Sequence, residues 1–380
     1  MIGGELINKG SYGCIYKPGL KCNSEQKEMK ENIITKVQMI NKFSIKEMEI
    51  SKKIVESYKD YSEHFSPILE SCEEVEIKEI EDELKKCTVI EKNQKFILNK
   101  MKYEGDKILG VTLFENVSKE VALRQYFYSL IMVLESIEKL NDIDIIHLDL
   151  KSNNIIYNNN KERPIIIDFG LSCELEKLKN NKDYEKDIFF TYAYDYEPWC
   201  IDLSIITYIV EKNKKNEKIT KEEYETNIVK IISDYSRNNT SVFLEMKGDY
   251  DVKLKKYFEK YIGKSYSDLS EDLKKNAKSW DGYSVLIMYN YLLLDLFNKE
   301  SNNELKEIGK LKEFIEGIEK NLYINPDERK TAKELKELFK GIIKKIGKKE
   351  LSKKMKEGNK LEFYKRIKGT EEIKTTMMKN

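Results

Sequence analysis

The chain has 380 residues, of which 40% are hydrophobic and 36% charged, and its formal net charge is +1. That length suits two lobes or domains rather than one small core. The near balance of charge excludes a global electrostatic attraction to nucleic acid or an anionic membrane, and no apolar run reaches the ~18 residues of a membrane-spanning helix.

The N-terminus, cysteines and histidines limit the class of protein further. The start, MIGGELINKG, has no signal-peptide core, and Ile2 in place of glycine excludes myristoylation. Six scattered cysteines without a Cys-x-x-Cys pair favour a reduced, intracellular protein located in the cytoplasm. Two histidines are too few for a His-rich zinc site.

Residues 1–105 alternate short strand-like runs with one helical segment. The runs are ELINKG, CIYKP, NIITKVQMI, SPILESCEEVEI and KFILNKM. The segment SIKEMEISKKIVESY predicts a helix whose apolar residues gather near one face, namely Ile45, Met48, Ile50, Ile54 and Val55. This first part is therefore predicted to be a small β-rich lobe with one helix.

From about residue 118 the sequence is mainly helical. The segment SKEVALRQYFYSLIMVLESIEKLN predicts a long amphipathic helix with Ser118 as its N-cap. Residues 200–278 are helical and rich in Lys, Glu and Tyr, and the lysine-dense end predicts a solvated tail. We therefore divide the chain into an N-lobe (1–105), a C-lobe (106–341) with a helical insertion at about 200–278, and a tail (342–380).

A polar turn lies between two apolar runs in IIHLDLKSNNIIYNNNKERPIIIDFGLS, residues 145–172. Phosphoryl transfer needs a carboxylate that accepts the proton of the attacking hydroxyl, ligands for Mg²⁺, and cations near the phosphates. The chain supplies those groups in that order, as Asp149, Lys151, Asn154 and Asp168. A chance polar turn before the buried strand PIIIDFG would explain a lone Asp-Phe-Gly, but not the whole set.

The turn resembles the H-R-D-x-K-x-x-N catalytic loop and the D-F-G motif of eukaryotic-type protein kinases. The resemblance implies that Asp149 is the catalytic base and that Lys151 neutralises the γ-phosphate during transfer. It also implies that Asn154 and Asp168 are the Mg²⁺ ligands. Leu148 replaces the usual arginine before the aspartate, which removes a contact for an activation-loop phosphate.

The segment INKGSYGCIYKP resembles the glycine-rich loop of that family, with Asn8 in place of the first glycine. Gly10 and Gly13 would let backbone amides approach the phosphates, and Ile15 would lie against the adenine. The ATP-binding residues implied by the resemblance are Ile7, Asn8, Gly10, Ser11, Tyr12, Gly13, Ile15, Lys36, Asn154, Ile156 and Asp168.

Lys36 in NIITKV matches the lysine on the third strand of the family, with Ile34 where alanine is usual. Its ion-pair partner should come from the following helix. Glu47 suits this role better than Glu49, because Ile50 and Ile54 then follow at inward-facing offsets. The alternative is that Glu47 is a solvated charge on a highly charged helix. Together with Asp149 and Lys151, Lys36 and Glu47 complete the set of catalytic candidates.

The segment TYAYDYEPW resembles a degraded T-x-x-Y-x-A-P-E motif, with Thr191 and Tyr194 in register and Glu197-Pro198 reversed. Without the arginine at position 148, the activation segment must be ordered by packing rather than by a phosphate. The aromatic residues available for this packing are Phe189, Phe190, Tyr192 and Tyr196. We therefore expect the unphosphorylated protein to be active.

Two aspartates are candidates for the start of the buried helix that braces the catalytic loop in this family. Asp202 begins IDLSIITYI, whereas Asp281 begins SWDGYSVLIMYNYLL. The Trp-Asp-x-Tyr-Ser pattern favours Asp281, which makes residues 200–278 an insertion after the activation segment. The segment NPDERKTAKELKELF resembles the closing D-P-x-x-R-x-T helix, with Arg329 as its arginine.

The resemblance spans residues 1 to about 340 outside the insertion and is greatest to the serine/threonine kinases of giant and other large DNA viruses. It implies an α+β, bilobal protein-kinase fold in a protein of the host cytoplasm or virion. It also implies ATP- and magnesium-dependent transfer of the γ-phosphate to serine or threonine hydroxyls of a protein substrate, with no nucleic-acid partner. Lys151 supports the serine/threonine class.

Two other functions remain open. A pseudokinase or scaffold that binds nucleotide weakly is favoured by departures from the motifs, at Asn8, Ile34, Leu148 and Glu197-Pro198. A small-molecule phosphotransferase of the antibiotic-kinase type would share the aspartate and asparagine of the loop. Those enzymes usually lack the equivalent of Lys151 and a complete Asp-Phe-Gly.

Overall fold

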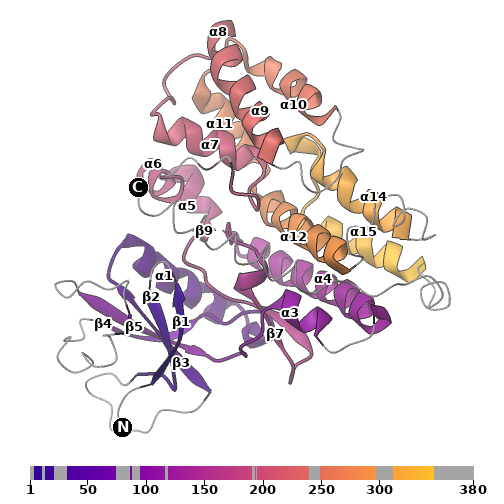
Figure 1. Ribbon diagram of the computed structural model, residues 1–380. Coiled ribbons are helices and arrows are strands. Elements are labelled where there is room, and N and C mark those ends of the chain that lie inside the picture. Colours follow the sequence, from indigo (N-terminus) through magenta and orange to yellow (C-terminus); the bar gives the residue numbers. More distant parts are fainter. Residues whose placement is uncertain are drawn as a thin grey trace. The chain divides into compact units, whose positions relative to one another are not determined.

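The computed structural model describes residues 4–10, 13–20, 32–73, 86–87, 95–115, 119–190, 193, 195–238, 249–296 and 311–345. The chain divides into two units (Figure 1). The first contains the described residues up to Lys107 together with Asn154–Ser172, and the second contains Ile108–Asn153 and the described residues from Cys173 onward. The chain is thus α+β, with a β-rich first unit and a largely helical second unit.

A five-stranded antiparallel sheet forms the centre of the first unit, in the order β1-β2-β3-β5-β4. Its strands are β1 (Glu5–Gly10), β2 (Gly13–Lys17), β3 (Ile33–Met39), β4 (Ile68–Glu73) and β5 (Phe96–Lys102). Alternate apolar side chains meet on one face, which is the expected pattern for a half-buried sheet. This core contains Cys14, Tyr16, Leu20, Val37, Cys87, Phe96 and Leu98.

Helix α1 (Lys42–Ser57) follows β3 and packs near β4 (Figure 1). Asn41 caps it through a capping box with Ser44, which satisfies backbone amides of the first turn. The helix buries Ile50 and Ile54 but leaves Ile45 48% exposed. The expectation that Ile45 shares the apolar face is therefore wrong, because five residues at ~100° each place it about 140° around the helix from Ile50.

The hairpin of β7 (Ile155–Asn158) and β8 (Arg163–Ile166) belongs to the first unit. Its membership follows from backbone hydrogen bonds to the earlier part of the chain. Ile166 accepts from the N–H of Ser66 at 3.0 Å and donates to His64 O at 2.9 Å. Tyr157 donates to Lys107 O at 3.2 Å. These long-range bonds cannot be read from the local pattern.

The second unit packs helices around α12 (Trp280–Leu296). Its other described helices are α3 (Leu109–Phe114), α4 (Lys119–Asp142), α5 (Leu175–Asn180), α6 (Lys182–Ile188), α7 (Ile201–Glu211), α8 (Lys221–Glu223), α9 (Val229–Asn238), α10 (Tyr250–Phe258), α11 (Tyr266–Lys274), α14 (Leu311–Leu322) and α15 (Ala332–Lys345). Helix α12 packs against α4, α14 and α15 (Figure 1). Two short strands, β6 (Ile145–Ile146) and β9 (Cys173–Glu174), pair beside this core.

These helices can be compared with the helical segments predicted from the sequence. Residues 200–278 are helical over α7 to α11, as predicted, apart from residues 239–248, which lie outside the described residues. The proposed N-cap Ser118 also lies outside them. Helix α15 extends to Lys345, past the predicted boundary at 341, and the tail from residue 346 lies outside the described residues.

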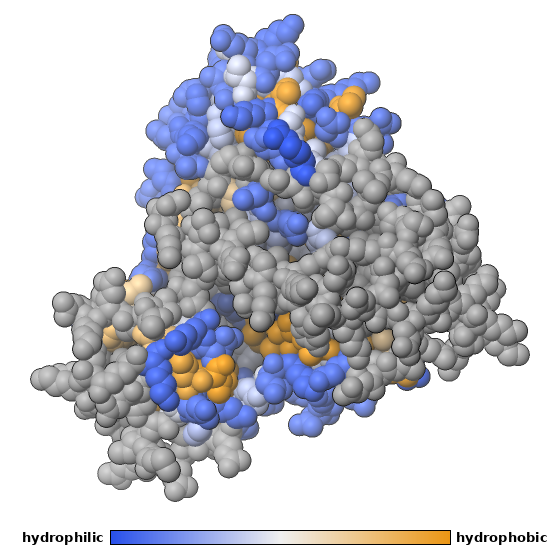
Figure 2. Space-filling view, viewed as in Figure 1, coloured by the Kyte–Doolittle hydropathy of each residue, from blue (hydrophilic) through white to orange (hydrophobic). Residues whose placement is uncertain are grey.

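Polar residues cover most of the coloured surface in Figure 2, with apolar residues confined to smaller patches. This distribution agrees with the high charged fraction of the sequence. Among the residues that the structure describes, no helix has both the length and the apolarity needed to cross a membrane.

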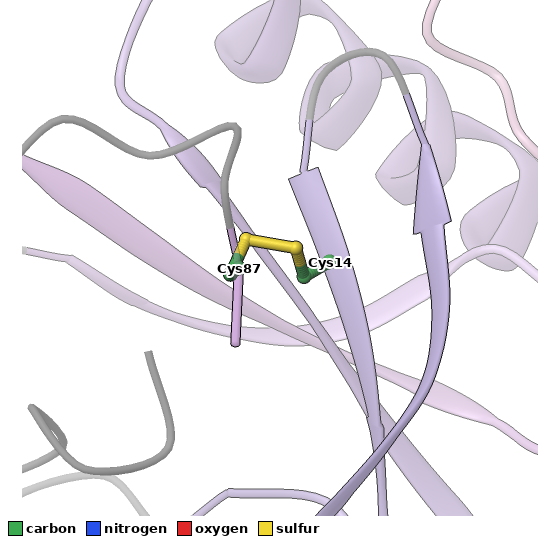
Figure 3. The surroundings of a disulfide bond; sticks show 2 residues. All are labelled: Cys14 and Cys87. Carbon is green, nitrogen blue, oxygen red and sulfur yellow. A yellow bond between two sulfur atoms is a disulfide. The ribbon is translucent and has the colours of Figure 1, made fainter. Parts of the chain in front are cut away.

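A disulfide joins Cys14 of β2 to Cys87, 73 residues further along the chain (Figure 3). Both residues are buried in the core of the sheet, and their Cα atoms lie 5.9 Å apart. Cys72 of β4 is also disulfide-bonded, whereas Cys173 and Cys200 are buried cysteines outside any disulfide. The expectation of reduced cysteines is therefore wrong for Cys14, Cys72 and Cys87. In the Cys14–Cys87 bond, the fold brings together two residues whose spacing in sequence gives no sign of a pair.

Candidate active site

The candidate site in the first unit is built around Lys36 on β3. The Nζ atom of Lys36 donates to both carboxylate oxygens of Glu47 on α1, at 2.8 and 2.9 Å. It also donates to Oδ1 of Asp168 at 3.2 Å, across 132 positions of sequence. All three side chains were singled out from the sequence, and the predicted pairing of Lys36 with Glu47 rather than Glu49 is confirmed.

The electrostatics of this cluster keep the lysine charged. Burial lowers the pKa of Lys36, but attraction by Asp168 and Glu47 outweighs that effect and holds the pKa above its usual value. One ammonium group faces two carboxylates, so the formal charges of the three side chains sum to −1. A local excess of negative charge favours the approach of a further cation.

Asp168 and its neighbours occupy a turn after β8. Asp168 has a φ of +63°, in the left-handed region that non-glycine residues seldom adopt. The next residue, Phe169, is buried edge-on against Phe65, with ring centroids 6.1 Å apart. The backbone oxygen of Asn154 accepts a hydrogen bond from Ile167 N at 3.0 Å, which fixes Asn154 beside the backbone that leads into Asp168. The structure thus places the two predicted metal ligands, Asn154 and Asp168, on adjacent segments of the backbone.

The predicted glycine-rich loop is the turn of the β1–β2 hairpin. Gly10 pairs with Gly13 across the turn, and the two residues between them, Ser11 and Tyr12, lie outside the described residues. A Cβ atom at position 13 would lie 2.2 Å from the carbonyl oxygen of Val37 on the neighbouring strand. Gly13 is therefore required by close packing of β2 on β3, independently of any ligand.

The other predicted ATP-binding residues are also placed on strands of the first unit. Asn8 pairs with Ile15 across the hairpin, and a bulge at Ile7 leaves that side chain exposed. Ile15 in turn pairs with Lys36 of β3. Ile156 lies on β7 opposite Ile165. The sheet register therefore connects the hairpin to the Lys36 cluster.

In the second unit, the loop that carries Asp149 is held by Asp281 at the start of α12. Buried Asp281 accepts from the backbone N–H of His147 at 2.7 Å and from that of Leu148 at 3.0 Å. Leu148 has a φ of +64°, in the left-handed region that non-glycine residues seldom adopt. Burial raises the pKa of Asp281, and this effect is opposed by His147 and by the hydrogen bonds from the two backbone amides. The prediction that Asp281 braces this loop is confirmed.

Asp202 forms a different buried contact. It pairs with the guanidinium of Arg329, and it accepts from Nε1 of Trp280 at 3.0 Å. Burial lowers the pKa of Arg329, but attraction by Asp202 outweighs it, and the net shift is upward. The sequence identified Arg329 but not its partner, because the two residues are 127 positions apart.

Asp149 is buried, and two side chains converge on its Oδ1 atom. Lys151 Nζ lies 3.3 Å from Oδ1, and the hydroxyl of Tyr196 donates to the same oxygen. Trp199 supports the arrangement, since its Nε1 donates to Leu148 O at 2.8 Å and its ring meets that of Tyr196 edge-on at 5.4 Å. The sequence named Tyr196 only as a packing residue, and nothing in its spacing indicates a contact with Asp149.

The predicted site residues are divided between the two units. Lys36, Glu47, Asn154 and Asp168 belong to the first, and Asp149 and Lys151 to the second. Thr191 and Tyr194 of the activation segment lie outside the described residues. Within the described parts of the chain, no group of three or more His, Cys, Asp or Glu side chains is arranged to hold a metal ion.

Comparison with known families and curated proteins found no match for this chain. No protein-family model matches the sequence, and no curated protein matches it significantly. Any conclusion about function therefore depends on the residues themselves.

Proposed function

We propose that this protein is a serine/threonine-type protein kinase with the bilobal fold of that family. The observation that carries the proposal is the cluster of Lys36, Glu47 and Asp168, in which one lysine bonds to two carboxylates from separate parts of the chain. A lysine held in this way is suited to contact nucleotide phosphates, and an Asp-Phe-Gly aspartate beside it is suited to hold magnesium.

The residues of the first unit fit a magnesium ion. Asn154 and Asp168 offer an amide oxygen and a carboxylate, which are hard oxygen donors, and the cluster around Lys36 carries excess negative charge. Mg²⁺ is commonly held by only one or two protein side chains, the rest of its shell being water and phosphate oxygens. When bound, it would neutralise charge on the phosphates of ATP.

The residues of the second unit supply the remaining chemistry. Asp149 would orient the substrate hydroxyl and accept its proton, and Lys151 would neutralise charge on the phosphoryl group in transfer. Asp281 fixes the backbone immediately before Asp149. Lys151 at this position, two residues after the aspartate, supports serine or threonine hydroxyls of a protein as the acceptor.

The test is transfer of radiolabelled phosphate from ATP to generic proteins such as casein or histone, compared with a panel of small-molecule acceptors. We expect magnesium-dependent labelling of protein that is lost in Asp149→Asn. Labelling of the small molecules alone would identify a small-molecule phosphotransferase and overturn the proposal. Labelling by Asp149→Asn at the wild-type rate would show that another residue carries the reaction.

A nucleotide-binding pseudokinase is the second candidate, and one observation favours it. The hydroxyl of Tyr196 already bonds to the carboxylate of Asp149, which the substrate hydroxyl would need to reach. A protein that gains thermal stability from MgATP but transfers no phosphate, in both the wild type and Tyr196→Phe, would establish this function instead.

A further inference from the structure

A buried ion cluster connects helix α6 to the helical insertion. Glu185 of α6 is 1% exposed, and its Oε1 atom lies 3.2 Å from Nζ of Lys274, which is 3% exposed. Lys215 pairs with the other carboxylate oxygen, and Ser270 Oγ donates to Oε1 at 3.4 Å. Every partner of Glu185 in this cluster comes from residues 200–278, between α7 and the end of α11.

Because these charges are buried, the cluster holds helix α6 against the insertion. A carboxylate without water is stable only when cations and hydrogen-bond donors replace its hydration, and Glu185 has both. Lys274 is balanced on its other side by Glu271, at 2.5 Å. Separating α6 from the insertion would break both ion pairs of Glu185 at once, so α6 cannot leave the insertion without an energetic cost.

Helix α6 lies in the segment between the Asp-Phe-Gly turn and Tyr196, which would be the activation segment under the proposed function. The segment begins at β9, which pairs with β6, and Glu174 N donates to Tyr184 OH at 2.9 Å. Phe189 at its far end packs edge-on against Trp280, with centroids 6.3 Å apart. Helix α6 itself packs on α7, and α7 on α11 (Figure 1).

Packing by aromatic residues does not account for this order by itself. Phe189 and Tyr196 are buried as the sequence suggested, but Phe190 is 40% exposed, and Tyr192 lies outside the described residues. A phosphate on such a segment acts by adding negative charge that surrounding cations hold. In this chain, the Glu185 carboxylate already provides a negative charge between two lysines.

We propose that the helical insertion is an internal clamp, in which Lys215 and Lys274 hold Glu185 and so order the activation segment without phosphorylation. This inference rests on the proposed function for the identity of the segment, and it assigns a role to residues 200–278. The clamp is permanent, because a glutamate cannot be removed by a phosphatase. The activity of the site would then be independent of a modifying enzyme.

The test compares Glu185→Gln and Lys274→Gln with Lys275→Gln as the matched control. Lys275 is adjacent to Lys274, but its side chain is 72% exposed and pairs with Asp272 at 2.6 Å. Hydrogen exchange of peptides covering residues 173–190 is the direct readout. We expect at least tenfold faster exchange in both cluster variants, wild-type exchange in the control, and at least a tenfold loss of phosphotransfer in the cluster variants.

A milder variant keeps the test decisive if the buried substitutions prevent folding. Lys215→Gln removes a partly exposed cation and leaves the Glu185–Lys274 pair in place, so a smaller rise in exchange of the same peptides is expected. Unchanged exchange in Lys215→Gln and in whichever cluster variant folds would overturn the clamp. Faster exchange of residues 173–190 after phosphatase treatment of the wild type would overturn its independence from phosphate.

The exchange readout also separates this inference from the proposed function. If the wild type transfers no phosphate but the cluster variants exchange faster, the clamp stands as a structural device and the kinase proposal fails. If the wild type is an active kinase and the cluster variants match Lys275→Gln in both exchange and rate, the clamp fails and the proposed function stands.

Discussion

Replacing Asp281 with alanine gives the sharpest test of how the second unit is built. The substitution removes the acceptor of two buried backbone amides, those of His147 and Leu148. Hydrogen bonds to a charged group contribute about 1.5–3 kcal/mol each, so the two together contribute about 3–6 kcal/mol. Burial of the carboxylate offsets part of this, as the raised pKa of Asp281 indicates. We therefore expect the free energy of unfolding to fall by about 2–5 kcal/mol.

Thermal and urea unfolding measure this change. At roughly 2–4 °C per kcal/mol for a unit of 150–250 residues, the melting temperature should fall by ~4–20 °C. Asp281→Asn keeps one acceptor oxygen but turns an amide N–H₂ toward the second backbone N–H, so about half of the loss is expected. The carboxyl of Asp281 holds its proton more tightly in the folded protein than in the unfolded chain. Its contribution to stability therefore falls as the pH rises from the ordinary pKa of aspartate to the raised pKa. Asp281→Asn removes this pH dependence.

Asp142→Ala, an exposed substitution at the end of α4, is the control. The reasoning is refuted if Asp281→Ala unfolds at the same temperature as that control. Asp202→Ala provides a second comparison. The sequence alone predicts that it matters far less than Asp281→Ala, but the buried pair with Arg329 makes a comparable loss of stability the expected result. Phosphotransfer at a temperature where both variants remain folded should fall more for Asp281→Ala, since Asp281, unlike Asp202, bonds to the loop before Asp149.

Four further predictions concern the site and the sheet. Asp149→Asn should leave ATP binding almost intact and lower turnover by ~10²–10⁴; a parallel loss of nucleotide affinity would contradict its role as the base. Asp168→Ala should abolish the magnesium-dependent rise in melting temperature with ATP, and a wild-type shift that EDTA does not alter would show metal-independent binding. Replacing both Cys14 and Cys87 with serine should lower the free energy of unfolding by about 2–5 kcal/mol in urea titrations, and equal stability would show that the bond contributes nothing. Because Leu148 cannot bind a phosphate, phosphatase treatment should change the rate by less than about tenfold, with mass spectrometry used to confirm dephosphorylation.

The sequence by itself was sufficient to predict most helices and strands and to select the polar residues of the candidate site. Alternating apolar residues predicted the strands of the sheet, and the helical spacing of Ile50 and Ile54 placed Glu47 on the side that faces Lys36. The Trp-Asp-x-Tyr-Ser pattern at the head of an apolar helix identified Asp281 as the brace. The strands and the side of α1 that carries Glu47 were predictable because they depend on residues close in sequence, where backbone geometry fixes which side chains share a face. Asp281 was identified through the resemblance instead, since its bonds to His147 and Leu148 span more than 130 positions.

Only the tertiary structure decided which distant side chains meet. The contact of Tyr196 with Asp149 crosses 47 positions, the Cys14–Cys87 bond 73, and the Ser270–Glu185 hydrogen bond 85. The assignment of the β7–β8 hairpin to the first unit has the same origin, since it depends on backbone bonds to His64 and Ser66. Periodicity shows that a residue is buried but not what it is buried against, because that depends on how whole elements pack once the chain has folded.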